Sequence, residues 1–294
     1  MKLTSRRTIL TSAAAVAGLP LLNDLAGRGR TAAAATAGYT SNTELYNSKI
    51  HKEGTHWARR FRRTPPHELI DNASAGSEPI RSTVIIAPHG GGIEEGTSEL
   101  CLAIAGYTLA GSGATLPAPV PDEPQRDYWM FEGISESSAL HVTSTLCDDP
   151  AALHICGSNM YAVSLHGFAG DTTRKVLIGG KDTRLKQNLQ ATFARHYGES
   201  DAARTVEVVI AGPDDPLDGD DPKNIVNRTR TGAGAQLEIS RALRSAMFGD
   251  FTNGPSRRST AGVGTGHEGY FWNGFVKAVR EAVNDHERGV ISVP

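Results

Sequence analysis

The chain has 294 residues, of which 39% are hydrophobic and 21% charged, and its formal net charge at pH 7 is −2. This hydrophobic content is enough for one sizeable core. The sequence contains no internal repeat and no sustained heptad pattern, which excludes a repeat array and a coiled coil.

The first predicted element is an export signal. Arg6 and Arg7 precede an uncharged run over residues 8–22, and small-residue A-x-A sites follow at 33–35 and 35–37. Paired arginines before such a run are typical of a twin-arginine signal. The run is shorter than the ~20 apolar residues that a membrane-spanning helix needs. We therefore expect a bacterial protein that is secreted by the twin-arginine pathway, without a stable membrane anchor.

Cleavage after Ala37 would leave residues 38–294 as the mature protein, which we expect to form a single domain. The signal, residues 1–37, holds five Lys/Arg residues and one Asp, so its removal changes the formal net charge from −2 to −6. A mature chain this acidic is a poor general binder of nucleic acid. Residues 38–75 are polar and weakly patterned, and we predict a lead-in on the surface, with arginines at Arg59, Arg60, Arg62 and Arg63.

Beyond this lead-in, apolar and β-branched runs alternate with helical patterns. Such alternation is typical of an α/β domain in which a mostly parallel or mixed open sheet is covered by helices on both faces. The last helical pattern has apolar residues at helical spacing, which predicts a packed face. The predicted strands cover 82–88, 127–133, 139–145, 160–167, 175–180, 205–212 and 235–240, and the predicted helices cover 97–105, 183–196 and 269–286.

Three cysteines limit the chemistry further. Cys147 and Cys156 are close in sequence and could pair in an oxidising compartment, which would leave Cys101 as a buried thiol in an apolar run; the spacing does not decide this. No CxxC motif occurs, so a cysteine zinc site is not expected.

The segment APHGGGIEEGTSEL has the composition of a metal-binding turn. His89 follows a predicted strand directly, the glycines at 90–92 allow backbone conformations that other residues resist, and Glu94 comes five positions after His89. A tight turn can therefore aim an imidazole and a carboxylate at one point. These are ligands of catalytic zinc, which takes three protein ligands and keeps one position open. We predict Thr97 as a cap of the helix that follows.

Two competing interpretations of the glycines are weaker. A phosphate-binding loop would need GxxxxGK[ST], which is absent. HGGG also resembles the oxyanion-hole loop of some α/β-hydrolases, but that scheme needs a G-x-S-x-G elbow, and GISES and GPSRR both lack the second glycine. An ordinary turn with a structural histidine remains the alternative, so the metal interpretation depends on a third ligand.

His166 is the predicted third ligand. It ends an apolar strand and precedes Gly167, which repeats the strand–His–Gly arrangement at His89. In α/β sheets, function collects at the carboxyl ends of strands. His141 is the main alternative, but it falls inside the predicted strand 139–145, so we interpret it as a core residue or as one that orients a ligand.

A hydrolytic site also needs a base, and Glu238 is the candidate. Its apolar neighbours Leu237 and Ile239 predict partial burial, which would raise its pKa into a useful range. Upstream, Asn227 and Arg228 are candidate substrate-binding residues, because a guanidinium can grip a carboxylate or stabilise an oxyanion. The ordinary alternatives are a solvent-facing glutamate and a surface ion pair.

Six sequence blocks occur in the order APHGGGIEEGTSEL, LHVTSTLCDDP, VSLHG, LIGG, NIVNR and GAQLEIS. In this order they resemble the poly-γ-glutamate hydrolases of bacteriophages and bacilli. The resemblance implies a zinc-carboxypeptidase-like fold and one zinc ion per chain, held by His89, Glu94 and His166, with Glu238 as general base and Arg228 near the substrate. Cys147 stands where family members commonly carry an aromatic residue, which leaves the natural substrate open.

These features predict a secreted zinc amidase that cleaves γ-glutamyl amide bonds, with poly-γ-glutamate as the expected substrate. That polymer is a polyanion and the mature chain is acidic, so attraction must be local, and Arg228, Arg230 and the arginines at 59–63 could supply it. Two alternatives remain open. One is a zinc amidase of cell-wall stem peptides, which also contain γ-linked glutamate. The other is a metal-containing binding protein for anionic polymers, against which a base beside the metal argues.

Overall fold

The computed structural model describes residues 38–64, 81–109, 116–135, 137–170, 172–198 and 201–294. Contacts divide the chain into Met1–Thr31 and Ala32–Pro294, and all described residues belong to the second unit. The predicted export signal over 1–37 therefore lies outside the described residues. Within them, no helix combines the length and the apolar character that crossing a membrane requires.

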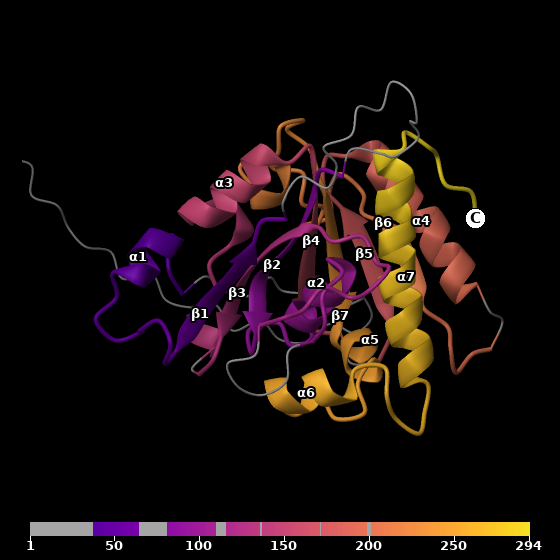
Figure 1. Cartoon of the computed structure of the whole chain (residues 1–294), viewed down its shortest axis with the longest axis horizontal. Coiled ribbons are helices and arrows are strands. Elements are labelled where there is room, and N and C mark those ends of the chain that lie inside the picture. The colour runs from indigo at the N-terminus through magenta and orange to yellow at the C-terminus, as the bar shows by residue number, and fades with distance from the viewer. Residues whose placement is uncertain (1–37, 65–80, 110–115, 136, 171, 199–200) are drawn as a thin grey trace, which may run out of the picture. The chain divides into compact units, whose positions relative to one another are not determined.

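A seven-stranded mixed sheet is the centre of this unit (Figure 1). Its strands are β1 (Trp57–Arg62), β2 (Thr83–Gly91), β3 (Asp127–Gly133), β4 (Tyr161–Phe168), β5 (Lys175–Gly179), β6 (Glu207–Ile210) and β7 (Ala235–Ser240). The strand order is β1-β3-β2-β4-β7-β5-β6. The central strands β3, β2, β4 and β7 are parallel, while β1 is antiparallel to β3 and β5 is antiparallel to β7. The predicted α/β class with an open, mostly parallel mixed sheet is confirmed.

Helices pack on both faces of this sheet. They are α1 (Asn42–Tyr46), α2 (Thr97–Ile104), α3 (Pro150–Ser158), α4 (Thr183–Tyr197), α5 (Arg241–Ala246), α6 (Gly254–Thr260) and α7 (Glu268–Glu287), with 3-10 turns η1 (Ser137–Ala139), η2 (Ser144–Leu146) and η3 (Ile225–Asn227). Successive side chains of a strand point to opposite faces, so Ile85 and Ile86 belong to separate buried clusters. Ile85 packs with α2, α4, α5 and α7, and Ile86 packs with α1 and α3.

The strand order creates a switch point beside β2. The chain continues from β2 to β3 on one side and then crosses to β4 on the other side. Open α/β sheets bind ligands at such points, beyond the carboxyl ends of the strands. In Figure 1, the arrow of β2 points toward the end of the sheet where α5 and α6 lie. Any site at the switch point should therefore lie near these two short helices.

Two predictions of secondary structure are wrong. The predicted strand 139–145 instead comprises the end of η1, an irregular segment over 140–143 and the start of η2. Leu140 and Val142 are buried there, so their alternation reflects packing against a sheet face. The segment does not pair with β4, because β2 and β7 already occupy both sides of that strand. Conversely, the lead-in contains β1, an edge strand whose arginines form ion pairs, for example Arg60 with Glu132 at 3.4 Å.

The start of α2 and the cysteines also differ from expectation. The N-cap of α2 is Gly96, at φ +95°, and not Thr97, whose hydroxyl donates to Glu94 O (2.9 Å). A glycine takes this left-handed conformation without strain, so the turn closes one residue earlier. All three cysteines are free and buried, so the pairing considered for Cys147 and Cys156 is absent. Burial raises the pKa of both thiols, which leaves them protonated and unreactive.

Candidate metal centre

The carboxyl end of β2 carries a bulge that releases His89 from the regular strand. The ladder between β2 and β3 shifts register between Ala87 and Gly90, which places Pro88 and His89 in the bulge. A bulge is one of the few places where a central strand tolerates proline. Pairing of β2 with β4 ends earlier, at Ile86. The imidazole of His89 can therefore turn toward the end of β4.

Close backbone approach explains the glycines that follow. Gly91 has φ +67°, and a Cβ atom there would lie 2.4 Å from Gly133 O. The turn closes with a hydrogen bond from Glu94 N to His89 O (2.8 Å). It brings the carboxylate back onto the imidazole, with His89 Nδ1 2.8 Å from Glu94 Oε1. The loop thus aims both side chains at one point, as its sequence predicts.

Glu94 also reaches the end of β4. Its Oε2 accepts a hydrogen bond from Gly167 N (2.9 Å) and lies 3.5 Å from His166 Nδ1. That same nitrogen lies 3.1 Å from His89 Nδ1. His89 and His166 are both buried. The three predicted ligands therefore meet at the switch point of the sheet.

The outer ring nitrogens of these two histidines already have partners. His89 Nε2 donates to Val142 O (2.8 Å). His166 Nε2 lies 2.9 Å from Ser164 Oγ and 3.3 Å from Ser144 Oγ. A neutral imidazole that uses Nε2–H in this way presents a lone pair at Nδ1. With both rings in this form, two lone pairs and a carboxylate make up a donor set suited to zinc. Without a metal, the two rings pair with the carboxylate instead.

His141 lies at the same place, although its sequence position suggested a strand interior. Its ring centroid is 3.9 Å from that of His89, and its Nε2 is 3.8 Å from Glu94 Oε1. Its Nδ1 is buried and has no hydrogen-bond partner among the described residues. The ligand atoms of His89, Glu94 and His141 lie within 4.8 Å of one another. Either His141 or His166 can complete the ligand set, and the role of His166 stays a prediction.

The electrostatics of the cluster suit a cation. Although burial opposes ionisation, the imidazoles of His89 and His166 hold the pKa of Glu94 well below its usual range. Burial, and then the neighbouring His89, lowers the pKa of His141 to about 3. An ionised carboxylate beside a neutral imidazole is the protonation state that metal binding requires. The residues present therefore fit a zinc ion.

Glu238 lies on the adjacent strand. β4 and β7 are in register with His166 opposite Glu238, so the two side chains share a face of the sheet. Glu238 Oε1 accepts a hydrogen bond from Gln236 Nε2 (3.0 Å), and Gln236 Oε1 accepts one from Asn224 Nδ2 (2.8 Å). Burial raises the pKa of Glu238 to about 7. The predicted burial is confirmed, whereas no sequence motif pointed to Gln236 or Asn224.

Asn227 and Arg228 are not brought to this cluster. Asn227 belongs to η3, and its amide is committed to the backbone: it donates to Gly219 O (2.8 Å) and accepts from Gly234 N (3.1 Å). Gly234 precedes β7, so this is the amino end of the strand. Arg228 is exposed, and within the described ranges no hydrogen bond or ion pair joins it to Glu238. Their roles in substrate binding stay predictions that this placement does not favour.

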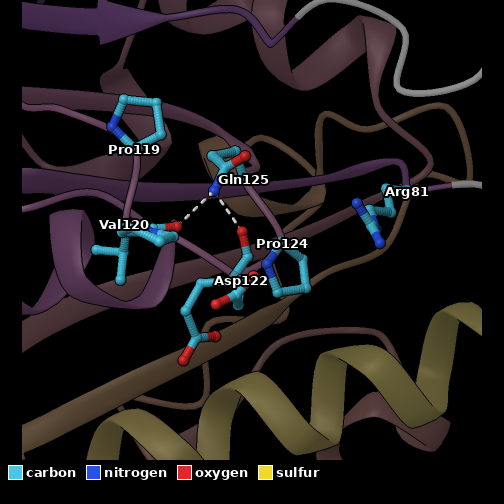
Figure 2. A pocket seen from close by; sticks show the side chains of 8 residues that line it. Arg81, Pro119, Val120, Asp122, Pro124 and Gln125 are labelled. Atoms are coloured by element: carbon cyan, nitrogen blue, oxygen red, sulfur yellow. Dashed lines mark hydrogen bonds between the residues drawn. The ribbon is translucent and has the colours of Figure 1, made fainter.

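Two of the cavities lie at opposite ends of the parallel strands. One, of about 550 Å³, is lined by Arg81 and the loop before β3, where Gln125 Nε2 donates to Val120 O at 3.1 Å (Figure 2). Arg81 and Gln125 precede β2 and β3, so this cavity is at the amino ends, and none of the predicted site residues lines it. Another, of about 370 Å³, is lined by Gly91 and Glu95 together with residues of α6. Its lining includes neighbours of Glu94 in the glycine loop but none of the predicted site residues.

Comparisons with known proteins show the family of this chain. Residues 71–115 and 118–267 match the family described as poly-gamma-glutamate hydrolase. The chain is 33% identical over 173 residues to the UPF0714 protein YndL of Bacillus subtilis (strain 168), covering 58% of this chain and 57% of YndL. It is 34% identical over 193 residues to the SPbeta prophage-derived UPF0714 protein YoqZ of the same organism, covering 63% and 61%. The match spans about three fifths of the length of these relatives.

Two solved structures have a similar fold. A bacteriophage poly-gamma-glutamate hydrolase aligns with a TM-score of 0.63 and 28% identity, over 85% of this chain and 98% of that chain. The zinc-free apo form of YndL aligns with a TM-score of 0.62 and 26% identity, over 84% and 99%.

Proposed function

This chain belongs to the poly-gamma-glutamate hydrolase family, and we propose that it is a zinc-dependent amidase that hydrolyses γ-glutamyl amide bonds of poly-γ-glutamate. The observation that carries the proposal is the convergence at one switch point. His89 Nδ1 and His166 Nδ1 are 3.1 Å apart beside the Glu94 carboxylate, and the buried Glu238 lies on the next strand in register. A set of metal ligands with an adjacent general base is the arrangement that a metallohydrolase uses for catalysis.

Each residue of the site has a distinct role in the proposed reaction. His89, Glu94 and His166 would hold the zinc ion, with His141 as the alternative third ligand. When bound, zinc supplies a Lewis acid that polarises the scissile carbonyl and favours ionisation of water. Glu238 takes a proton from the attacking water and returns it to the departing amine.

The surroundings of Glu238 suit this proton transfer. Burial raises its pKa to about 7, so both the ionised and the protonated forms are accessible near neutral pH. Gln236 Nε2 fixes Oε1, which leaves Oε2 to take the proton. Gln236 is itself oriented by Asn224, so the carboxylate is held in one position before the substrate arrives.

Substrate carboxylates need cations near the cluster. The arginines of the lead-in are occupied, since Arg59 pairs with Glu53 at 3.0 Å and Arg63 with Asp127 at 3.1 Å. Arg258 lines the cavity next to the glycine loop, and within the described residues no hydrogen bond or ion pair engages its guanidinium. Arg258 is therefore a further candidate, besides Arg228, to bind a carboxylate of a γ-linked chain.

One observation favours a second candidate, an amidase of cell-wall stem peptides. The loop over 212–221 contains five aspartates and packs against the residues that orient the base, with Leu217 O 3.5 Å from Gln236 Nε2. Asp215 contributes to the raised pKa of Glu238. An acidic rim repels a polyanion and tolerates a less charged γ-glutamyl peptide.

A substrate panel tests the proposal. The zinc-loaded protein is incubated with poly-γ-glutamate, α-linked polyglutamate and muropeptides, and both chain length and newly formed amines are followed. We expect poly-γ-glutamate to be shortened and the α-linked polymer to remain intact. Cleavage of muropeptides alone would replace the proposal with the second candidate. Binding without any new amine would identify a non-catalytic binding protein.

A further inference from the structure

We propose that Arg244 is a positioning residue that fixes the three chain segments carrying the candidate site relative to one another. The inference rests on the proposed function in that the site it positions is the zinc site described above. Arg244 lies in α5, directly after β7, and its side chain is buried.

Each donor group of Arg244 bonds a different segment of the site. Nε donates to Ile239 O (3.1 Å), next to Glu238 in β7. Nη1 donates to Glu95 O (2.6 Å), next to Glu94 in the glycine loop. Nη2 donates to Phe168 O (3.3 Å), two residues after His166 in β4. One side chain thus joins the segments that carry the base, the carboxylate ligand and the predicted third ligand.

The geometry requires arginine. A guanidinium presents its donors in a rigid planar fork, whereas a lysine ammonium is a single point on a flexible stem. Among the described residues, Arg244 forms no ion pair with a carboxylate, so its hydrogen bonds go to backbone carbonyls. A lysine at 244 would keep the charge but could not bridge three carbonyls in one plane.

The Gly167 position supports the same assignment. A Cβ atom at Gly167 would lie 2.5 Å from Arg244 Cζ, so only glycine lets the guanidinium lie against β4. Gly167 N in turn donates to Glu94 Oε2 (2.9 Å). The glycine after His166 therefore serves two contacts at once, one with the arginine and one with the carboxylate ligand.

Loss of the three hydrogen bonds of Arg244 should loosen the ligand set without removing a ligand. Substitution of residues that orient metal ligands typically lowers metal affinity about 10–100-fold. We expect Arg244→Lys and Arg244→Gln to weaken zinc binding by that factor. We also expect them to lower kcat while KM changes less than about threefold, because the substrate-binding groups stay in place.

The control is Arg280→Gln. Arg280 also donates to a backbone carbonyl, Ala103 O, at 3.1 Å, and pairs with Glu123 at 2.6 Å. It joins α7 to the far end of α2, away from the cluster. Its loss removes a partly buried arginine that likewise donates to a backbone carbonyl, so it should leave zinc affinity within about twofold of wild type.

Two measurements on the full chain test the role of Arg244. One is zinc affinity by chelator competition, and the other is amide hydrogen exchange. We expect faster exchange over residues 92–100 and 166–170 in both Arg244 variants but not in Arg280→Gln. If Arg244→Gln fails to fold, Arg244→Lys decides. Wild-type affinity together with unchanged exchange in Arg244→Lys would overturn the proposal. Exchange needs no turnover, so a chain without hydrolase activity would still test Arg244 separately from the proposed function.

Discussion

At the scale of single residues, His166 has the better arrangement for a metal ligand. Two serine hydroxyls, Ser164 and Ser144, lie within hydrogen-bond distance of its Nε2, while Nδ1 faces Glu94 and His89. Ligating histidines almost always use their second nitrogen in this way. The buried Nδ1 of His141 instead has no partner in the part of the chain that the structure describes, so its ring is less firmly oriented.

Zinc binding by single-alanine variants distinguishes these two histidines. We expect His166→Ala to lose zinc affinity by at least about 100-fold, because two protein ligands remain where a catalytic site uses three. His141→Ala should lose about tenfold or less, through disturbed orientation. Chelator competition at pH 7 measures both. The reverse order would make His141 the third ligand, with His166 as the orienting residue.

The sequence could predict the site residues that lie at strand ends or in glycine turns. This holds for His89, Glu94 and His166, and Glu238 could be predicted from its apolar neighbours. His141 could not be placed, because its flanking alternation of apolar residues is also typical of a strand. The hydrogen bonds of Gln236 and Arg244 join segments far apart in the chain, and no local pattern reports them.

At the scale of elements, the start of α4 and the end of α7 are joined by one titrating group. Asp182 is the N-cap of α4 and accepts a hydrogen bond from Leu185 N (2.9 Å). Its Oδ2 lies 3.0 Å from Nε2 of His286, near the end of α7. His286 is buried, and its Nδ1 accepts from Arg184 Nε (3.1 Å). Nε2 therefore carries a hydrogen and lies beside the Asp182 carboxylate, although within the described residues the two form no hydrogen bond of normal geometry.

Asp182→Asn should destabilise the protein, by about 1–3 kcal/mol at pH 7. Asparagine can still cap α4, but its amide group would face the N–H of His286. Burial raises the pKa of Asp182, but His286 and Leu185 N outweigh this and lower it. A depressed pKa contributes stability above the unfolded value of about 4, and this is lost as pH falls through the folded value.

The difference in unfolding free energy between wild type and Asp182→Asn should therefore shrink between pH 7 and pH 3 in urea titrations. The exposed Asp214 offers a matched substitution, Asp214→Asn, which should change stability by less than about 0.5 kcal/mol. A constant difference across this pH range would show that the ionised form of Asp182 contributes nothing.

Long periodic elements could be predicted, whereas short ones could not. The helices α2, α4 and α7 appear where their spacing predicts them, because an apolar face needs several turns to be visible. α3 is short, although Asp149 as N-cap and Pro150 at its start are signals that could have found it. β1 was missed because its arginines resemble a solvated stretch, while in the fold they pair with acidic neighbours at a sheet edge.

At the scale of the whole molecule, export remains a proposal that the N-terminal sequence supports. Paired arginines are read by a receptor and do not act as generic positive charge. Replacing Arg6 and Arg7 together by Lys should leave uncleaved precursor in the cytoplasm, whereas a charge-preserving Lys2→Arg control should be secreted normally. Immunoblots of cell and medium fractions measure both. Normal secretion of the double-Lys variant would remove the twin-arginine assignment.

The central claim is that Glu238 acts as the base beside a zinc site built by His89, Glu94 and a third histidine. Glu238→Gln separates chemistry from metal binding, because glutamine has nearly the same shape but cannot take a proton from water. Its side chain can still accept the hydrogen bond from Gln236, so the fold should survive. General-base loss typically costs about 10²–10⁴-fold in rate.

The direct measurement is the initial rate of amine formation from poly-γ-glutamate, for wild type and Glu238→Gln, each with its bound zinc quantified in the same sample. We predict equal zinc content, similar KM, and a kcat lower by at least about 100-fold in the variant. A variant with full zinc content and wild-type kcat would contradict the account.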